Sequence, residues 1–445
     1  MQLVAYGAQD VYLTGNPKVT FFQAVYKRHT NFAMEVIEQT VNGSAGNDGR
    51  LSVTIARNGD LIGDMFLELT TIGTLSSRAG DNTVVSGCWC AERAIKDIEL
   101  TIGGQRIDKH YQIWWRLYSE LYLSADKKAN YAKMTTNANA ANSSDQVYLP
   151  LLFFFNRNPG LYLPLIALQY HEVRIDFDLA SEFTQYHSTS GFHVWGNYVY
   201  LDTEERRRFA QKGHEYLIEQ VQHTGADSVT PSTSSQVKQI RLSYNHPVKE
   251  LVWCYNSGSS SNNGMWNFTS NANSSNAIVL DSNPNSYITG NVATLSPIGT
   301  ATGVPQFYGG NYLRSWSGIG SNVSMAQWLE EGTPSTTMSA GPLATFKLIL
   351  NGQDRMKEQS GKYFNQVEPY MHHTGNPYPG VYSYSFALKP EEHQPTGTCN
   401  FSRIDNAQVQ VTSKANSILT SQWMFAVNYN VLRIQSGMGG LAFSN

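Results

Sequence analysis

The eight residues Ile98-Glu-Leu-Thr-Ile-Gly-Gly-Gln105 recur in a similar form later in the chain, as Phe346-Lys-Leu-Ile-Leu-Asn-Gly-Gln353. In both segments apolar residues occupy every second position, and a turn-forming pair follows: Gly-Gly in the first and Asn-Gly in the second. An apolar residue at every second position is typical of a β-strand with one buried face, and both pairs favour tight turns. The sequence therefore predicts the same strand and turn at two places in the chain.

Two more pairs of segments match in the same order. Residues 35–39 (EVIEQ) resemble 216–220 (YLIEQ), and 58–60 (NGD) resemble 245–247 (NHP), where an apolar strand follows in both cases. The offsets between the paired segments are 181, 187 and 248 residues, in chain order. Each match is weak by itself, but their shared order indicates an internal duplication, and the jump in offset predicts an insertion of about 60 residues in the second copy.

Alternation of apolar and polar residues is found along much of the chain, for example in residues 173–179 and 425–431. Stretches rich in Gly, Pro and Asn separate these segments. Many such strands, separated by turn-forming residues, are typical of β-sandwiches and β-barrels. We therefore expect an all-β fold.

Two helices are predicted within this pattern. Apolar residues follow helical spacing from Ile107 to Leu121. A second, short helix is predicted over residues 203–212, with Thr203 as its expected N-terminal cap and acidic residues in its first turn. Because this helix lies near the middle of the chain, we expect it to link the two copies.

The chain has 445 residues, of which 15% are charged, and a formal net charge of −3. A surface that is poor in charge suits burial against neighbouring molecules. The lack of a basic excess disfavours a nucleic-acid-binding protein, and the cluster at 206–208 (RRR) is interpreted as an exposed helix face that pairs with neighbouring glutamates. We therefore expect no direct contact with nucleic acid.

The four cysteines are too few for a disulfide scaffold in a chain of this length. The first residues lack the basic and continuously apolar regions of a secretory signal, and no apolar run reaches the length of a membrane-spanning helix. We expect synthesis in a reducing cytosol, without insertion into a membrane.

Residues 256–342 differ in composition from the rest of the chain, because they contain only four charged residues and much Asn, Ser, Thr and Gly. A disordered linker can have this composition, but aromatic residues such as Trp266 and Trp316 favour large ordered loops. Four N-x-S/T sequons are candidate glycosylation sites: Asn267, Asn273, Asn322 and Asn400.

The chain contains no recognised catalytic motif. Asp176 and Asp178 lie two residues apart on a predicted strand, where a solvent-exposed face is a simpler interpretation than a metal site. His372 and His373 could combine with residues 391–393 as an acid–base site, but polar surface or interface residues are favoured. We therefore expect no catalytic, cofactor-binding or metal-binding residues, and a hydrolase is the weakest hypothesis.

Two longer segments are more specific. Residues 6–33 (YGAQDVYLTGNPKVTFFQAVYKRHTNFA) and 390–406 (PEEHQPTGTCNFSRIDN) resemble the major capsid proteins of nucleocytoplasmic large DNA viruses, most closely those of algal viruses (phycodnaviruses) such as the chlorella viruses. The resemblance extends over the whole chain and is weakest in 256–342. Its signature positions are Gly7, Asp10, Tyr12, Gly15, Asn16, Pro17, Gly397, Cys399, Asn400, Phe401, Arg403 and Asp405.

The resemblance implies a double jelly roll, which consists of two tandem eight-stranded antiparallel sandwiches with a few short helices and long loops. Residues 25–202 and 213–445 would form the two jelly rolls, and 203–212 the helical linker between them. Residues 1–24 would lie on the inner face of a viral shell, and 256–342 would form long loops on its outer face.

The resemblance also implies a structural function without enzymatic activity or cofactor. Three chains would form a homotrimer, a pseudo-hexagonal capsomer that tiles an icosahedral shell in contact with neighbouring capsomers and with minor capsid proteins. An internal viral membrane would lie nearby, glycans would be attached covalently, and assembly would take place in the host cytoplasm. The alternative is a carbohydrate-binding protein of two β-sandwiches that attaches to host glycans, which the aromatic residues and Asn-rich loops of 256–342 motivate.

Overall fold

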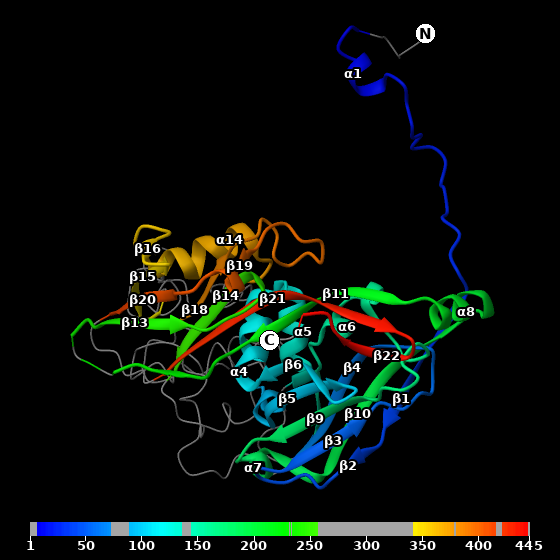
Figure 1. Ribbon diagram of the computed structural model, residues 1–445, viewed down its shortest axis with the longest axis horizontal. Coiled ribbons are helices and arrows are strands. Elements are labelled where there is room, and N and C mark those ends of the chain that lie inside the picture. The colour runs from blue at the N-terminus through cyan, green and yellow to red at the C-terminus, as the bar shows by residue number, and fades with distance from the viewer. Residues whose placement is uncertain are drawn as a thin grey trace, which may run out of the picture.

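The computed structural model describes residues 7–72, 89–135, 144–230, 232, 234–256, 341–377, 380–414 and 421–443. The strands in these residues form four antiparallel sheets, two in each half of the chain (Figure 1). The predicted dominance of β-structure is therefore confirmed.

Two sheets face each other in the first half. The strand order of one sheet is β1-β10-β4-β7, with the short strand β8 beside β4, and the order of the other is β2-β3-β9-β5-β6. The strands are β1 (Phe32–Gln39), β2 (Val41–Asn42), β3 (Arg50–Thr54), β4 (Leu61–Thr71), β5 (Ile95–Ile102), β6 (Gln105–Tyr111), β7 (Gln146–Pro150), β8 (Leu163–Pro164), β9 (Val173–Leu179) and β10 (His187–Leu201).

The second half repeats this arrangement. Its sheets have the orders β11-β21-β14-β18 and β13-β20-β15-β16, and short strands extend both sheets. The strands are β11 (His214–Gln222), β12 (Asp227–Ser228), β13 (Val237–Leu242), β14 (Pro247–Asn256), β15 (Leu343–Leu350), β16 (Gln353–Asp354), β17 (Gln359–Ser360), β18 (Val381–Ser385), β19 (Cys399–Asn400), β20 (Ala407–Ser413), β21 (Ser421–Gln435) and β22 (Met438–Leu441).

The order β1-β10-β4-β7 corresponds to β11-β21-β14-β18, and β3-β9-β5-β6 corresponds to β13-β20-β15-β16. The three repeated segments lie at equivalent places. Residues 35–39 and 216–220 lie in β1 and β11, the second pair precedes β4 and β14, and the third pair forms the β5–β6 and β15–β16 hairpins. Along the chain, connections repeatedly cross between the facing sheets, whereas hairpins such as β5–β6 and β15–β16 stay within one sheet, as in a jelly roll. The prediction of two tandem jelly rolls is therefore confirmed, and we refer to strands β1–β10 and β11–β22 as the first and second jelly rolls.

Short helices decorate the loops between strands. They are α1 (Val11–Thr14), α3 (Cys90–Arg93), α4 (Gln112–Leu121), α5 (Ala125–Thr135), α6 (Phe154–Arg157), α7 (Phe183–Tyr186), α8 (Thr203–Gln211) and α14 (Glu368–His372), together with the π-helix η6 (Tyr363–Val367) and the 3-10 turns η2 (Pro159–Leu161) and η7 (Phe401–Arg403).

Two details of the predicted helices are wrong. The helix expected from Ile107 begins only at Gln112, because residues 105–111 pair with β5 across the Gly103-Gly104 turn, in which both glycines have positive φ. The linker helix is present as α8, but Asp202 caps it: its carboxylate accepts the N–H of Thr203 at 2.7 Å.

The hydrophobic core consists of two clusters. One fills the first jelly roll and also includes residues of the second, such as Val252 and Phe425. The other lies inside the second jelly roll around Trp253, whose ring stacks on that of Phe346 with the centroids 4.5 Å apart. The first cluster thus joins the two halves of the chain.

The predicted insertion lies between β14 and β15, and residues 257–340 are outside the described part of the chain. The connection runs from Asn256 to Leu343, whereas the equivalent connection in the first jelly roll runs from Thr71 to Ile95. The connection in the second copy is therefore the longer of the two, and the insertion at 256–342 stays a prediction. Asn267, Asn273 and Asn322 lie outside the described residues.

Candidate assembly surfaces

The N-terminal segment 7–31 forms an arm that extends away from the rest of the molecule (Figure 1). The N–H of Gly7 donates to Asp10 at 2.6 Å at the start of helix α1, and Gly15 follows that helix. Large apolar side chains along the arm are exposed: Val11, Tyr12, Leu13, Val19, Phe21, Phe22, Val25 and Tyr26. These eight side chains lie open to solvent in the single chain.

The C-terminal signature segment anchors the start of strand β14. Gly397 has φ +142°, and a Cβ there would approach the Phe386 carbonyl oxygen to 2.9 Å. Cys399 then pairs with Val248, and the ring of Phe401 is 2% exposed. The signature positions Asn16, Pro17, Arg403 and Asp405 are exposed. The buried part of this signature therefore has a structural role.

Asn400 is an exposed member of the same segment. Its side-chain oxygen accepts the N–H of Ser402 at 3.0 Å and caps the turn η7. Of the four candidate glycosylation sites, it is the one that lies in the described part of the chain.

A buried ion cluster connects the two jelly rolls. Glu219 on β11 binds Lys249 at 2.7 Å and Arg157 of α6 at 3.0 Å. The Lys249 ammonium also donates to the Pro390 carbonyl at 2.6 Å, and its side chain is 1% exposed. Burial raises the pKa of Glu219, but the two cations outweigh this effect, so that the pKa lies below its ordinary value.

A second ion cluster lies beside helix α14. The His373 ring is buried between Glu250 at 3.1 Å and Glu391 at 3.2 Å, and it meets the edge of the Tyr122 ring. Burial alone would lower the pKa of His373, but the two carboxylates outweigh it and raise the pKa to about 9. The N–H of Gly375 donates to the Leu121 carbonyl at 2.8 Å, which ties this segment to α4 of the first jelly roll.

We expect the stabilising effect of His373 to decrease as the solution becomes alkaline. Its pKa rises from 6.5 to about 9 on folding, so the stability from its charge is complete below pH 6.5 and disappears as the pH rises through 9. The difference in unfolding free energy between wild type and His373→Asn, measured in urea, should therefore shrink from pH 6.5 to pH 9. A difference that stays constant over this range would contradict a charged His373.

The outer face of the sheet β1-β10-β4-β7 carries a groove of about 630 Å³. Its floor comes from all four strands: Val36 on β1, Trp195 on β10, Phe66 on β4, and Tyr148 on β7. The Trp195 indole N–H donates to Glu68 at 2.7 Å, and the rings of Phe66 and Tyr148 meet edge to face. Asp64, Glu68 and Asn156 also line the groove, which thus combines apolar and polar side chains within reach of solvent.

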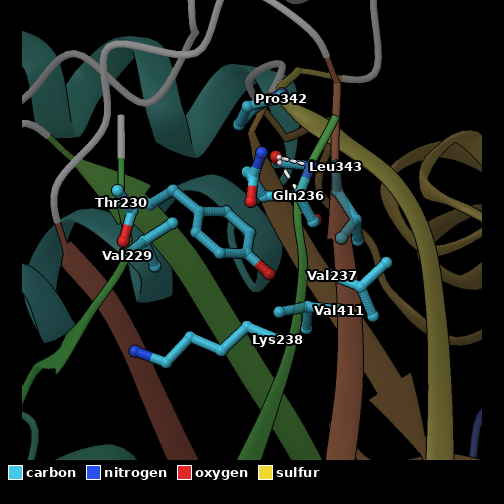
Figure 2. Close-up of a pocket in the computed structure, with 10 residues that line it drawn as sticks. Val229, Thr230, Gln236, Val237, Lys238, Pro342, Leu343 and Val411 are labelled. Carbon is cyan, nitrogen blue, oxygen red and sulfur yellow. Dashed lines mark hydrogen bonds between the residues drawn. The ribbon is translucent and has the colours of Figure 1, made fainter. Parts of the chain in front are cut away.

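A smaller cavity of about 240 Å³ lies at one end of the second jelly roll (Figure 2). Val229, Val237 and Val411 contribute apolar groups, and hydrogen bonds between Gln236 and Ser413 cross its rim. Lys238 is the charged residue among those that line it, and its ammonium group binds the Ser228 carbonyl. The lining therefore combines apolar side chains with the polar side chains of Thr230, Gln236, Lys238, Tyr255 and Ser413.

Most of the residues considered for catalysis are held in ion pairs. Asp176 accepts hydrogen bonds from Arg174 at 2.7 and 2.8 Å and is 5% exposed, so the predicted solvent exposure is wrong for this residue. Asp178 is partly buried, with Arg50 at 3.7 Å. Glu391 is brought next to His373, as the sequence allowed, but both are bound in the second ion cluster.

A metal-binding cluster and a membrane-spanning helix are both absent from the described residues. In this part of the chain, no three metal-binding side chains gather in one place. Among the helices of the same residues, none has both the length and the apolar character needed to cross a bilayer.

Comparison with protein families gives two matches that meet near α8. The model described as "Major capsid protein N-terminus" matches residues 20–202, and the model described as "Large eukaryotic DNA virus major capsid protein" matches residues 205–440. Together they include both jelly rolls.

Individual relatives agree with these matches. The major capsid protein of Paramecium bursaria Chlorella virus 1 is 44% identical over 479 residues, with 100% of this chain and 99% of the relative covered. The major capsid protein of Phaeocystis pouchetii virus is 40% identical over 527 residues, with the same coverage.

Solved structures show the same fold. The crystal structure of VP54 from PBCV-1 has a TM-score of 0.76 at 40% identity, covering 96% of this chain and 100% of VP54. The Faustovirus major capsid protein has a TM-score of 0.64 at 12% identity, covering 97% and 94%, and shows the fold alone. The chain belongs to the major capsid proteins of large eukaryotic DNA viruses, a structural, non-enzymatic family that forms the virion capsid.

Proposed function

We propose that three copies of this chain form a trimeric, pseudo-hexagonal capsomer that tiles the icosahedral outer shell of the virion. The observation that carries this proposal is the repeated strand order, because two similar jelly rolls in each chain give six in a trimer. Six similar blocks around a three-fold axis approximate a hexagon, which packs into a continuous layer. Weak contacts repeated between many capsomers then stabilise the shell.

Within this capsomer, we assign residues 25–202 and 213–445 to the two jelly rolls and 203–212 to the linker. The junction of the two family models between residues 202 and 205 supports this division. Residues 256–342 would supply the outer loops, with glycans on sequons there or at Asn400.

We assign residues 1–24 to the inner face of the shell, where the exposed apolar side chains of the arm would bind minor capsid proteins. An internal membrane would lie beneath this layer without insertion of the chain, and assembly would take place in the host cytoplasm. The net charge of −3 suits a shell that does not contact the genome.

The trimer can be tested directly by native mass spectrometry of the purified chain. We expect a species of about 149 kDa, three times the chain mass of 49.6 kDa. A monomer that persists under assembly conditions would contradict the proposal.

Deletion of residues 2–24 is expected to leave the trimer intact and to prevent closed shells from forming. The reason is that the arm is exposed along its length, so the fold does not need it, whereas its apolar side chains need a partner. Native mass spectrometry measures the trimer, and electron microscopy of particles from infected cells measures shell closure. Deletion of residues 2–6 alone is the control, because it keeps the described arm. Normal shells from the longer deletion would argue against a role for the arm.

A further inference from the structure

We infer that the groove face of the first jelly roll binds the η6–α14 segment of a second copy of this chain. The groove face is the outer side of β1-β10-β4-β7 that carries Val36, Phe66, Tyr148 and Trp195. This inference rests on the proposed trimer and names the two surfaces that would close it.

The groove face carries several large apolar side chains beside its carboxylates. Residues directed outward from an antiparallel sheet are normally polar when solvent covers that side. Here the outward positions of β1 are Phe32, Met34 and Val36, which are 51%, 47% and 50% exposed. The aromatic residues of the groove continue this apolar surface across the other three strands. An apolar surface on both sides of a sheet indicates that both sides are covered in the assembled state.

The equivalent sheet of the second jelly roll is already covered on both sides. Leu251 and Trp253 of β14 belong to the core cluster inside this jelly roll, whereas Val252 and Cys254 of the same strand belong to the cluster of the first. Phe425 of β21 packs on the same side as Val252, with its ring 5.5 Å from that of Trp114 in α4. Within one chain, the first jelly roll therefore covers this sheet of the second jelly roll. The equivalent sheet of the first jelly roll has its groove face exposed.

Two connections of the first jelly roll supply this cover. Helix α4 lies in the connection from β6 to β7, and helix α6, which holds Arg157 against Glu219, lies in the connection from β7 to β9. The equivalent connections of the second jelly roll run from β16 to β18 and from β18 to β20. The first of these contains η6 and α14, and the second contains the loop around Leu388.

These equivalent connections carry exposed apolar side chains. Val367, Tyr370 and Met371 have helical spacing and are 40%, 88% and 51% exposed, and Leu388 is 75% exposed. Phe364 on the same segment is buried in the core. A helical segment that is apolar on both sides is expected to be buried on both sides in the assembled protein. We call these four exposed residues the α14 patch.

Charges of opposite sign lie near the two surfaces, and Glu38 also pairs with His193 at 2.6 Å on the groove face itself. Glu38, Asp64 and Glu68 lie on outward positions of the groove sheet, as the alternation of its strands shows. Lys362 and Lys389 lie beside the α14 patch and are exposed, with Lys389 also 2.8 Å from Glu392. Within a chain, the α4 and α6 connections of the first jelly roll cover the β11-β21-β14-β18 sheet of the second. If the α14 patch of each copy covers the groove face of the next copy, the same kind of contact is repeated between chains. Three such head-to-tail contacts close a ring.

Cysteine cross-linking tests the contact in the trimer. Tyr370→Cys is combined in one chain with Val36→Cys or with Phe66→Cys, and the purified protein is treated with a short bis-maleimide. We expect covalent dimers and trimers in denaturing gels from the double variants. The single variants should give none above the wild-type level, because each chain then carries only one of the two partners. Trimers that give no cross-link with either pair would overturn the inference and leave the proposed trimer standing.

A second measurement uses charge at the same surface. Tyr370→Asp/Met371→Asp should weaken the trimer at least about 30-fold, the effect of a 2 kcal/mol interface residue. Tyr170→Asp is the matched control, because Tyr170 is 76% exposed and lies outside both surfaces. Thermal unfolding of the variants verifies that the fold is retained. An unchanged trimer that no longer forms shells would instead assign the α14 patch to another capsid component and overturn the inference, whereas a wild-type monomer would contradict the proposed trimer itself.

Discussion

Replacement of Glu219 by alanine is expected to lower the free energy of unfolding by about 3–5 kcal/mol, because it removes one partner of a buried ion pair. Glu219 is the shared anion of Lys249 and Arg157, and the Lys249 side chain is almost completely buried. Without the carboxylate, the ammonium group keeps the Pro390 carbonyl and the face of the Tyr429 ring, but no anion at hydrogen-bond distance among the described residues. Equilibrium unfolding in urea, at one protein concentration because the chain assembles, measures the loss.

Two variants test whether the loss comes from the buried ion cluster or from any substitution on strand β11. Glu215→Ala removes an exposed carboxylate from the same strand, where Glu215 pairs with Arg433 at 2.9 Å, and should cost at most about 1 kcal/mol. Lys249→Met in the Glu219→Ala background should recover part of the loss, because the uncompensated ammonium is then replaced by an apolar side chain. Equal effects of Glu219→Ala and Glu215→Ala would contradict the role of the buried cluster.

The second large effect is expected for Trp253→Ala, which should also cost about 3–5 kcal/mol because it leaves a large cavity in the core of the second jelly roll. Trp253 is completely buried, and its ring lies within 5.7 Å of the rings of Phe346, Phe364 and Tyr382. These rings come from β15, η6 and β18, so the cavity would loosen both sheets of this jelly roll. Urea unfolding again measures the change.

Phe443→Ala is the control for this substitution, because it also removes an aromatic ring, but one that is 62% exposed. It should change the unfolding free energy by less than about 0.5 kcal/mol. Trp253→Phe, which keeps most of the stacking, should fall between the two alanine variants. A loss below about 1 kcal/mol for Trp253→Ala would show that the second jelly roll does not depend on this ring.

Much of the fold could be predicted from the sequence, because the duplicated hairpins kept the residues that their geometry requires. Gly103 and Gly104 in the first hairpin, and Asn351 and Gly352 in the second, all have positive φ. A turn of this kind accepts few other residues, so its signature survives where the strands diverge. The start of α4 could not be predicted in the same way. Residues 107–111 fit both helical and strand spacing, and only the pairing with β5 decides between them.

The candidate assembly surfaces were harder to predict from the sequence than the fold. The arm and the C-terminal segment stood out as signature sequences, but their exposure and burial did not. The cluster of Arg157, Glu219 and Lys249 joins three distant parts of the chain, and no local pattern connects them. The groove face gave a faint signal, since Phe32, Met34 and Val36 alternate with other residues along β1, but alternation alone does not say which face is covered.

The shared core cluster sets the order of events during synthesis. Residues from β14 and β21, including Val252 and Phe425, complete the cluster that fills the first jelly roll. Since β21 is translated near the end of the chain, the ribosome releases the first jelly roll with part of its core still exposed. A truncated product that lacks β21 would therefore leave apolar residues of the first jelly roll, which pack with Phe425 and Val427 in this chain, open to solvent.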